Sequence, residues 1–174
     1  LYSGADKIVI NTSIYENLNL IDEISENIGA QSIIISIDVK KIDKRYICFS
    51  HSGSKNCGFE LMSFLESLSK KKIGELMLCS IDHEGTMKGY DLNLIQKVRK
   101  TTTLPVTVLG GAGSIDHIAK VIEENGGKVI GFTEKNDSFE FETSKALKNE
   151  DTFWGLCLDE DNQPELTEDR LEKW

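Results

Sequence analysis

The sequence predicts an α/β protein built on a parallel sheet of βα units. Four apolar runs rich in β-branched residues recur at 6–12, 31–38, 74–81 and 104–109, and a segment with helical spacing follows each run. Near-continuous apolar strands that alternate with amphipathic helices are typical of a parallel sheet buried on both faces. A chain of 174 residues is long enough for one such domain, so we expect a single domain over 1–174.

The predicted helices each place apolar residues on one face. These residues are Leu20, Ile21, Ile24 and Ile28 in the first helix, Phe59, Met62, Leu65 and Leu68 in the second, and Leu94, Ile95 and Val98 in the third. The segment 88–91 is predicted to form a turn and a helix cap. Ser114 and Asp116 cap or begin the fourth helix, which extends to about Gly126.

The stretch 39–58 is too long for a simple turn between a strand and a helix. RYICFS (45–50) alternates enough to form a short ribbon strand, with KKIDKR (40–45) as its turn. Loops of this length serve as lids or binding elements, and plain surface decoration is the alternative.

The remaining elements follow residue 125. GGKVIGF (126–132) is predicted to be a fifth core strand, and FEFE (139–142) and FWGLCLD (153–159) are two short strand-like pieces. Pro164 opens a final helix that carries Leu166 and Leu171.

Charge divides the chain near residue 121. Residues 1–121 contain 14 acidic and 14 basic side chains, whereas 122–174 contain 15 acidic and six basic ones and account for the whole net charge of −9. This change of composition predicts two segments of different origin, 1–121 and 122–174. The acidic balance argues against nucleic acid or an anionic membrane as a partner.

The sequence indicates neither a metal site nor a membrane segment. Cys48, Cys57, Cys79 and Cys157 show no CxxC spacing and the histidines are scattered, so we expect small buried thiols and no metal. No apolar run approaches about 20 residues. The first residues contain neither an initiator Met nor the basic region of a signal peptide, from which we expect a cytoplasmic chain cut from a longer one.

Polar residues and glycines stand at the carboxyl ends of the predicted strands, where parallel α/β proteins bind ligands. Gly110, Gly111 and Gly113 follow the fourth strand and would let backbone amides approach an anion. We predict phosphate binding there, with a tight strand–helix connection as the alternative. Asn11 and Thr12 follow the first strand and either bind a second anion or cap the next helix.

Acidic residues follow the second and third strands. Asp38 ends the second strand, and Asp82 and Glu84 lie in the loop after the third. If burial raises its pKa, Asp38 suits general acid or base chemistry. The alternative is an N-cap or a partner of Lys40 or Lys41.

Five motifs in the first 121 residues resemble the cyclase subunit of imidazole glycerol phosphate synthase. They are GADKIVINT, IISIDVK, HSGSKNCG, LMLCSIDHEGTMKGYD and LPVTVLGGAGSIDH, in this order. Paralogues that act in surface-polysaccharide biosynthesis are similar as well, above all in TMKGYDL. The resemblance implies a (β/α)8 barrel, or TIM barrel, of which this chain contains the fourth to seventh βα units.

The same resemblance implies a lyase of histidine biosynthesis. Such an enzyme receives ammonia from a glutaminase subunit and converts a doubly phosphorylated ribulosyl nucleotide into imidazole glycerol phosphate and an aminoimidazole carboxamide ribonucleotide. The implied roles are general acid for Asp38, binding of one phosphate for Asn11 and Thr12, and binding of the other phosphate for Glu84, Gly85, Gly110 and Gly111. Glu84 stands where the family usually has Asp. The family's catalytic partner Asp lies on its first strand, which this chain does not contain.

From about residue 123 the sequence resembles a different family. GGKVIGF and SFEFETSKALKNEDTFWGLCLDEDNQPELTEDRLEKW are similar to the C-terminal part of a long-chain flavodoxin. This implies a chimera whose half-barrel is completed to a flavodoxin-like open three-layer sandwich by the flavodoxin's last strand and helix. The resemblance covers none of the flavin-binding loops, so we expect no cofactor.

These observations predict a chimeric or truncated cyclase-derived domain that binds phosphate or a phosphorylated small molecule without turnover of its own. Two alternatives stay open, namely an active cyclase when the missing barrel units are supplied and an FMN-binding electron carrier. The parent family implies a glutaminase subunit as a partner, and open sheet edges would allow a homo-oligomer.

Overall fold

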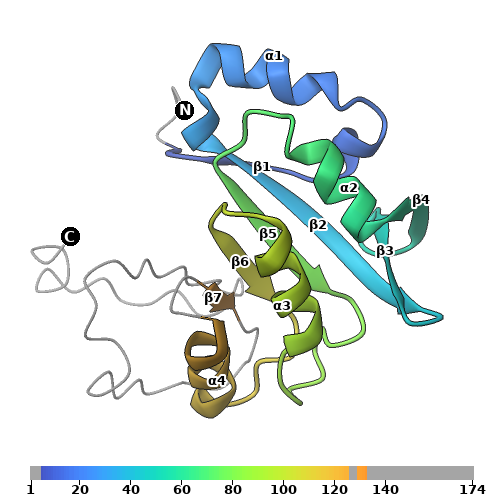
Figure 1. The fold of residues 1–174 in the computed structure, drawn as a ribbon, viewed down its shortest axis with the longest axis vertical. Coiled ribbons are helices and arrows are strands. Elements are labelled where there is room, and N and C mark those ends of the chain that lie inside the picture. Colours follow the sequence, from blue (N-terminus) through green and yellow to red (C-terminus); the bar gives the residue numbers. More distant parts are fainter. Residues whose placement is uncertain (1–4, 126–128, 133–174) are drawn as a thin grey trace, which may run out of the picture.

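A computed structural model describes residues 5–125 and 129–132 of the chain. In these ranges seven strands form one sheet (Figure 1). Its parallel strands lie side by side in sequence order: β1 (Ile8–Ile10), β2 (Ile33–Ile42), β5 (Glu75–Ser80), β6 (Val106–Leu109) and β7 (Val129–Phe132). The predicted parallel sheet of βα units is therefore confirmed.

The helices of the described residues connect these strands. They are α1 (Asn19–Ile28), α2 (Leu61–Leu68), α3 (Leu92–Thr101) and α4 (Ile115–Asn125), with the 3-10 helices η1 (Thr12–Tyr15) and η2 (Ala30–Ser32). Right-handed crossovers between sequential parallel neighbours place their helices on one face of the sheet. In Figure 1, α2 and α3 both lie in front of it.

This arrangement is consistent with part of a (β/α)8 fold. A three-layer sandwich with helices on both faces, as expected from the flavodoxin resemblance, is not seen in the described residues. Most of the flavodoxin-like segment, 133–174, lies outside them, together with the predicted strands 139–142 and 153–159 and the final helix.

A continuous apolar core joins the helices to the sheet. Along β2, the residues Ile33, Ile35, Ile37 and Val39 are buried at alternate positions. The helical side of this core includes the fully buried side chains of Ile21, Leu61, Phe64, Leu68, Leu94 and Ile95. Because the side chains of a strand alternate, Ile34, Ser36 and Asp38 lie on the opposite face of the sheet, which we call the inner face.

The stretch 39–58 forms a hairpin extension of β2 with two further strands. β2 continues to Ile42, turns at Asp43 and Lys44, and returns as β3 (Arg45–Ser50), which β4 (Lys55–Glu60) pairs in antiparallel fashion. The predicted ribbon strand 45–50 is confirmed, whereas the turn is shorter than 40–45. β4 was not predicted from the sequence, because KNCGFE does not alternate regularly between apolar and polar residues.

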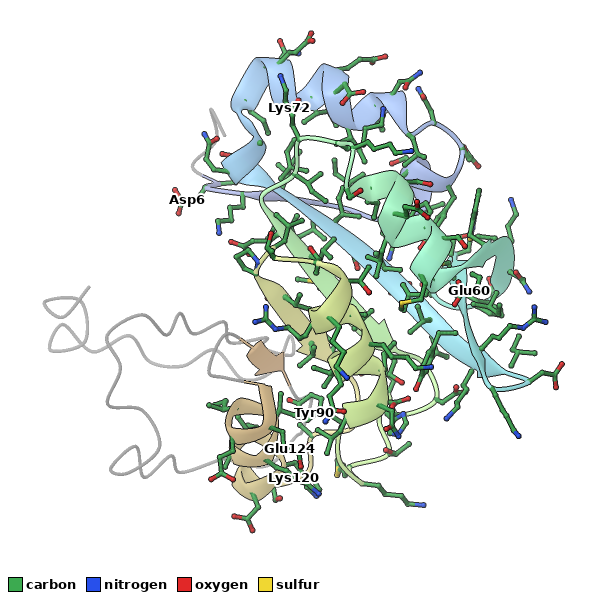
Figure 2. The ribbon with its side chains drawn as sticks, viewed as in Figure 1. Asp6, Glu60, Lys72, Tyr90, Lys120 and Glu124 are labelled. Atoms are coloured by element: carbon green, nitrogen blue, oxygen red, sulfur yellow. The ribbon has the colours of Figure 1, made fainter. Side chains whose placement is uncertain are left out.

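The second helix begins later than its apolar spacing predicts. Phe59, assigned to the core face of that helix, lies in β4 and is 40% exposed. The strand ends at Glu60, whose carboxylate accepts hydrogen bonds from the amides of Met62 and Ser63 at 3.1 and 3.3 Å (Figure 2). The chain direction changes at this cap, so the helical period cannot be extended back across it.

The other helix caps agree with the sequence. Oδ1 of Asp91 accepts a hydrogen bond from the amide of Leu94 at 3.0 Å, and Oγ of Ser114 accepts one from His117 at 3.3 Å. The side chains of Ser, Asp and Asn commonly satisfy the first free amides of a helix in this way. Both predicted caps are confirmed.

Candidate functional site

The carboxyl ends of β1, β2, β5 and β6 meet at one edge of the sheet. Asp38 of β2 lies beside Cys79 of β5, and Val39 lies beside Ser80. Beyond this point β2 leaves the parallel sheet and enters the hairpin, so Asp38 stands within a strand and does not end it. The site residues predicted from the sequence are grouped around this edge.

The carboxylate of Asp38 contacts Asn11 on the inner face. Nδ2 of Asn11 donates a hydrogen bond to Oδ2 of Asp38 at 3.0 Å and reaches Oγ of Ser36 at 3.4 Å. Within the described residues, Asp38 forms no ion pair with Lys40 or Lys41 and caps no helix. The structural alternatives that the sequence left open for Asp38 are therefore not observed.

Burial raises the pKa of Asp38 above its ordinary value, and the hydrogen bond from Asn11 opposes this effect only in part. A carboxyl group with a raised pKa keeps its proton closer to neutral pH, where it can donate it. The geometry and the direction of the shift both suit a general acid.

Asn11 and Thr12 do not cap the following α-helix. Asn11 precedes η1 without a side-chain cap bond, and α1 begins only after Leu18. Oγ1 of Thr12 instead accepts a hydrogen bond from the amide of His51 at 3.4 Å. This contact brings the turn between β3 and β4 to the end of β1.

The two acidic residues of the loop after β5, Asp82 and Glu84, make different contacts. Oδ2 of Asp82 accepts a hydrogen bond from the amide of Lys41 at 2.7 Å, which attaches the loop to β2. Oε2 of Glu84 lies 3.6 Å from Sγ of Cys79, on the side of the site. Gly85 follows with φ of +68°, and a Cβ at this position would meet no atom within 4 Å.

The glycines after β6 allow two loops to touch. The amide of Gly89 donates a hydrogen bond to the carbonyl of Gly111 at 2.6 Å, and a side chain at Gly111 would collide with that backbone. Gly110 and Gly111 also have φ of +96° and +102°, which favour glycine. The tight connection thus accounts for both glycines, and phosphate binding at them stays a prediction.

Three contributors to this region were not singled out from the sequence. Oγ of Ser36 and Oδ2 of Asp38 both accept from Nδ2 of Asn11, and Cys79 lies beside Asp38. Nδ1 of His117 accepts a hydrogen bond from the amide of Gly113 at 3.1 Å. Ser36 could have been found, because a serine that interrupts an apolar strand two residues before Asp38 shares its face. His117 could not, since its partner is a backbone amide in a loop.

The described part of the chain shows no group of three or more His, Cys, Asp or Glu residues that could hold a metal ion. In the same part, every helix is too short or too polar to cross a membrane. Of the thiols predicted to be buried, Cys48 is fully buried and Cys57 and Cys79 only half-buried, and Cys157 lies outside the described residues.

Comparison with known proteins supports the family resemblance. The family model described as "Histidine biosynthesis protein" matches residues 1–131. The imidazole glycerol phosphate synthase subunit HisF of Sulfurisphaera tokodaii is 41% identical over 123 residues, which cover 71% of this chain and 49% of that protein. The subunit HisF of a Thermotoga species is 41% identical over 114 residues, 66% of this chain and 45% of that protein.

A third relative carries the name putative imidazole glycerol phosphate synthase subunit hisF3. It comes from Vibrio vulnificus and is 35% identical over 130 residues, which cover 74% of this chain and 49% of that protein. The chain thus spans about half the length of the curated relatives that it matches. On the evidence of its sheet of sequential βα units and of the match over residues 1–131, this chain belongs to the histidine biosynthesis protein family.

Proposed function

We propose that this chain supplies the general-acid half of a cyclase of the imidazole glycerol phosphate synthase type. The observation that carries the proposal is the position of Asp38 at the edge of the sheet where the carboxyl ends of the strands and the glycine loops meet. Its carboxyl group is partly buried, has a raised pKa and accepts a hydrogen bond from Asn11. The printed names of the relatives support the reaction class.

In this proposal, protonated Asp38 donates its proton to a group of the substrate that gains negative charge or leaves. Proton transfer by a positioned side chain typically contributes a factor of about 10² to 10⁴ to a rate. Asn11 is a positioning residue, because its amide occupies Oδ2 and leaves Oδ1 of Asp38 as the proton donor. A base must then come from outside this chain's described residues.

Two backbone regions flank Asp38 and would hold the two phosphates of such a substrate. The end of β1, with Asn11 and Thr12, lies on one side, and the loops with Gly85 and Gly111 lie on the other. Backbone N–H groups in glycine-containing loops and at the first turn of a helix commonly bind anions. Since the side chain of Asn11 is engaged by Asp38, any phosphate contact from Asn11 would come from its backbone.

The exposure of the inner face supports the proposal that turnover needs further βα units. Barrel interiors are filled by layers of side chains from all the strands. On this chain, Val9 is 52% exposed, and Ile34, Met77 and Leu109 are half-buried on the same face. We propose that the missing units of the barrel cover this face and that a glutaminase subunit delivers ammonia to the completed enzyme. The chain alone is expected to bind a phosphorylated ligand without turnover.

The test is complementation in trans. The chain is co-expressed with the βα units that it lacks, taken from the Sulfurisphaera tokodaii relative, and assayed with ammonia and the doubly phosphorylated nucleotide. Cyclisation is expected from the mixture and from neither part alone. In the complemented enzyme, Asp38→Asn should lower kcat by about 100-fold or more, with ligand affinity nearly unchanged.

The matched control is Asp43→Asn, on the exposed turn between β2 and β3, which should leave kcat unchanged. Full activity of the Asp38→Asn variant would refute the general-acid role. If the parts associate and bind the ligand without any cyclisation, the chain is a phosphate-binding module only.

The chimeric origin of the chain stays a prediction. The family model extends to residue 131 and so includes residues 122–131, which were predicted to be of flavodoxin origin, and β7 pairs with β6 as a further parallel strand. Residues 133–174 lie outside the described residues. Electron transfer with FMN gains no support from the described residues, and we do not propose it.

A further inference from the structure

The hairpin beside the site holds two thiols at neighbouring positions of one ladder. β3 and β4 are antiparallel, with Phe49 opposite Asn56. Cys48 and Cys57 are the next residues along each strand from this pair, where the register of the ladder shifts. Facing residues of antiparallel strands have Cα atoms about 4.5 to 5.5 Å apart, and a disulfide spans Cα distances of about 4.4 to 6.8 Å. Two residues that follow a paired couple are therefore near enough for a bond that needs little movement of the backbone.

Tyr15 provides independent evidence that the two thiols are close. Its hydroxyl group is buried without an oxygen or nitrogen partner in the described residues and lies against the thiol of Cys48. Both Cys48 and Cys57 raise the pKa of Tyr15 through their charge, after the larger effect of burial. Cys48 and Cys57 therefore both lie near enough to the hydroxyl group of Tyr15 to affect its pKa.

The two thiols differ in their access to solvent. Cys57 is half-buried at the bulge, whereas Cys48 is fully buried. Burial, with a further contribution from Cys57, raises the pKa of Cys48 to about 12, so Cys48 is a poor first nucleophile. An oxidant from solvent would therefore react first at Cys57.

We propose that Cys48 and Cys57 form a reversible disulfide when the chain meets a low-molecular-weight disulfide such as oxidised glutathione. The thiolate of Cys57 attacks one sulfur of the oxidant, the S–S bond breaks, and the other sulfur leaves as a thiolate that takes up a proton. Cys48 then gives up its proton and attacks the sulfur of Cys57, which releases the second thiol. In total, the protein loses two hydrogen atoms and the oxidant becomes two thiols.

The bond would connect the redox state to the candidate site. It closes a loop that contains His51, whose amide donates to Thr12 at the end of β1. Tyr15, which touches Cys48, closes the 3-10 helix that begins at Thr12. Oxidation should therefore stiffen the turn that reaches the strand-end site, independently of any cyclase activity.

The experiment uses the full chain, first reduced and then incubated with oxidised glutathione. Intact mass should fall by two hydrogen atoms, and peptide mapping without reduction should find one link between Cys48 and Cys57. Amide exchange in the segment 51–56 should slow down, and dithiothreitol should reverse each change. Cys57→Ser should abolish the link, whereas the matched control Cys79→Ser should retain it.

Because Cys48 is fully buried, its variant should be the apolar Cys48→Val, with circular dichroism as a check of folding. In this variant we expect a stable glutathione adduct on Cys57, since no second thiol resolves it. The proposal is overturned if the native chain keeps that adduct as well, if the link forms to Cys79 or Cys157, or if no thiol reacts until the chain is unfolded.

Discussion

The pair of Asn11 and Asp38 determines the protonation of the site at the scale of single residues. Burial favours the neutral carboxyl group, and the amide of Asn11 favours the charged one, with burial the larger effect. The resemblance of motifs assigns Asn11 to a phosphate, but in the structure its side chain binds Asp38. A motif identifies a position in a family, whereas the partner of a flexible polar side chain depends on its neighbours in space.

This balance predicts how the stability of the chain depends on pH. The folded-state pKa of Asp38 lies above its ordinary value of 3.8, so the folded state binds the proton more tightly than the unfolded state. Its stabilising contribution is therefore complete below pH 3.8 and is lost as the pH rises through the folded-state pKa. Asp38→Asn, which does not titrate, should have a higher Tm than the native chain at neutral pH.

Thermal unfolding followed by circular dichroism at several pH values measures this difference. The gain in Tm should shrink as the pH falls toward the ordinary value of 3.8. Asp43→Asn, on the exposed turn, is the matched control. A gain that is the same at every pH would show that burial of the charge is not its cause.

At the scale of elements, the aromatic residues of the β4–α2 junction show how position decides the energetic role of a side chain. Tyr15 stacks on Phe64 at 4.9 Å between ring centroids, and Phe59 lies 5.4 Å from Phe64. Yet Phe64 is 1% exposed and Phe59 is 40% exposed. Within one cluster, Phe64 thus belongs to the core and Phe59 to the surface.

We predict that Phe64→Ala lowers the free energy of unfolding by about 3 to 5 kcal/mol, the usual cost of a large cavity in a core. Phe59→Ala, the matched control in the same cluster, should cost about 1 kcal/mol or less, because its ring is already partly in water. Urea unfolding of both variants measures the difference. Equal losses would mean that Phe59 is covered in solution.

The same junction shows the limit of periodicity. Apolar spacing located the helices correctly because each buries a stripe on the sheet, and the capping residues Asp91 and Ser114 marked two starts. It failed at Phe59, since apolar residues stand on both sides of the Glu60 cap. β4 was missed because an edge strand at a bulge need not alternate.

At the scale of the whole molecule, the sheet of sequential βα units is consistent with part of a (β/α)8 fold, with α2 and α3 on one face. Asn11 and Asp38 lie on its inner face near the carboxyl ends of the parallel strands, and Val9 is the most exposed large apolar residue in the described part of the chain. β1 pairs with the first residues of β2, whereas the far end of the hairpin lies at the other end of that strand (Figure 1). Val9 in β1 and Ile42 near the hairpin end therefore allow a comparison between the inner face and an unrelated surface.

Val9→Lys should weaken association with the missing βα units by about 10-fold or more, because a buried lysine without a partner costs more than about 1.4 kcal/mol. Ile42→Lys, at the hairpin end and 37% exposed, should leave the affinity unchanged. Isothermal titration calorimetry of the two parts gives both constants. If Ile42→Lys has the larger effect, the interface lies on the hairpin and not on the inner face.

The sequence by itself determined the family, the parallel strands with their helices, and the chemistry available at the strand ends, because periodicity and strand-end residues are local properties. Only the tertiary structure decided which of these residues meet. It joined Asn11 to Asp38, attached Asp82 to β2 and packed Gly111 against Gly89. These contacts span residues far apart in the chain, and they follow from sheet register and loop packing, which no local pattern encodes.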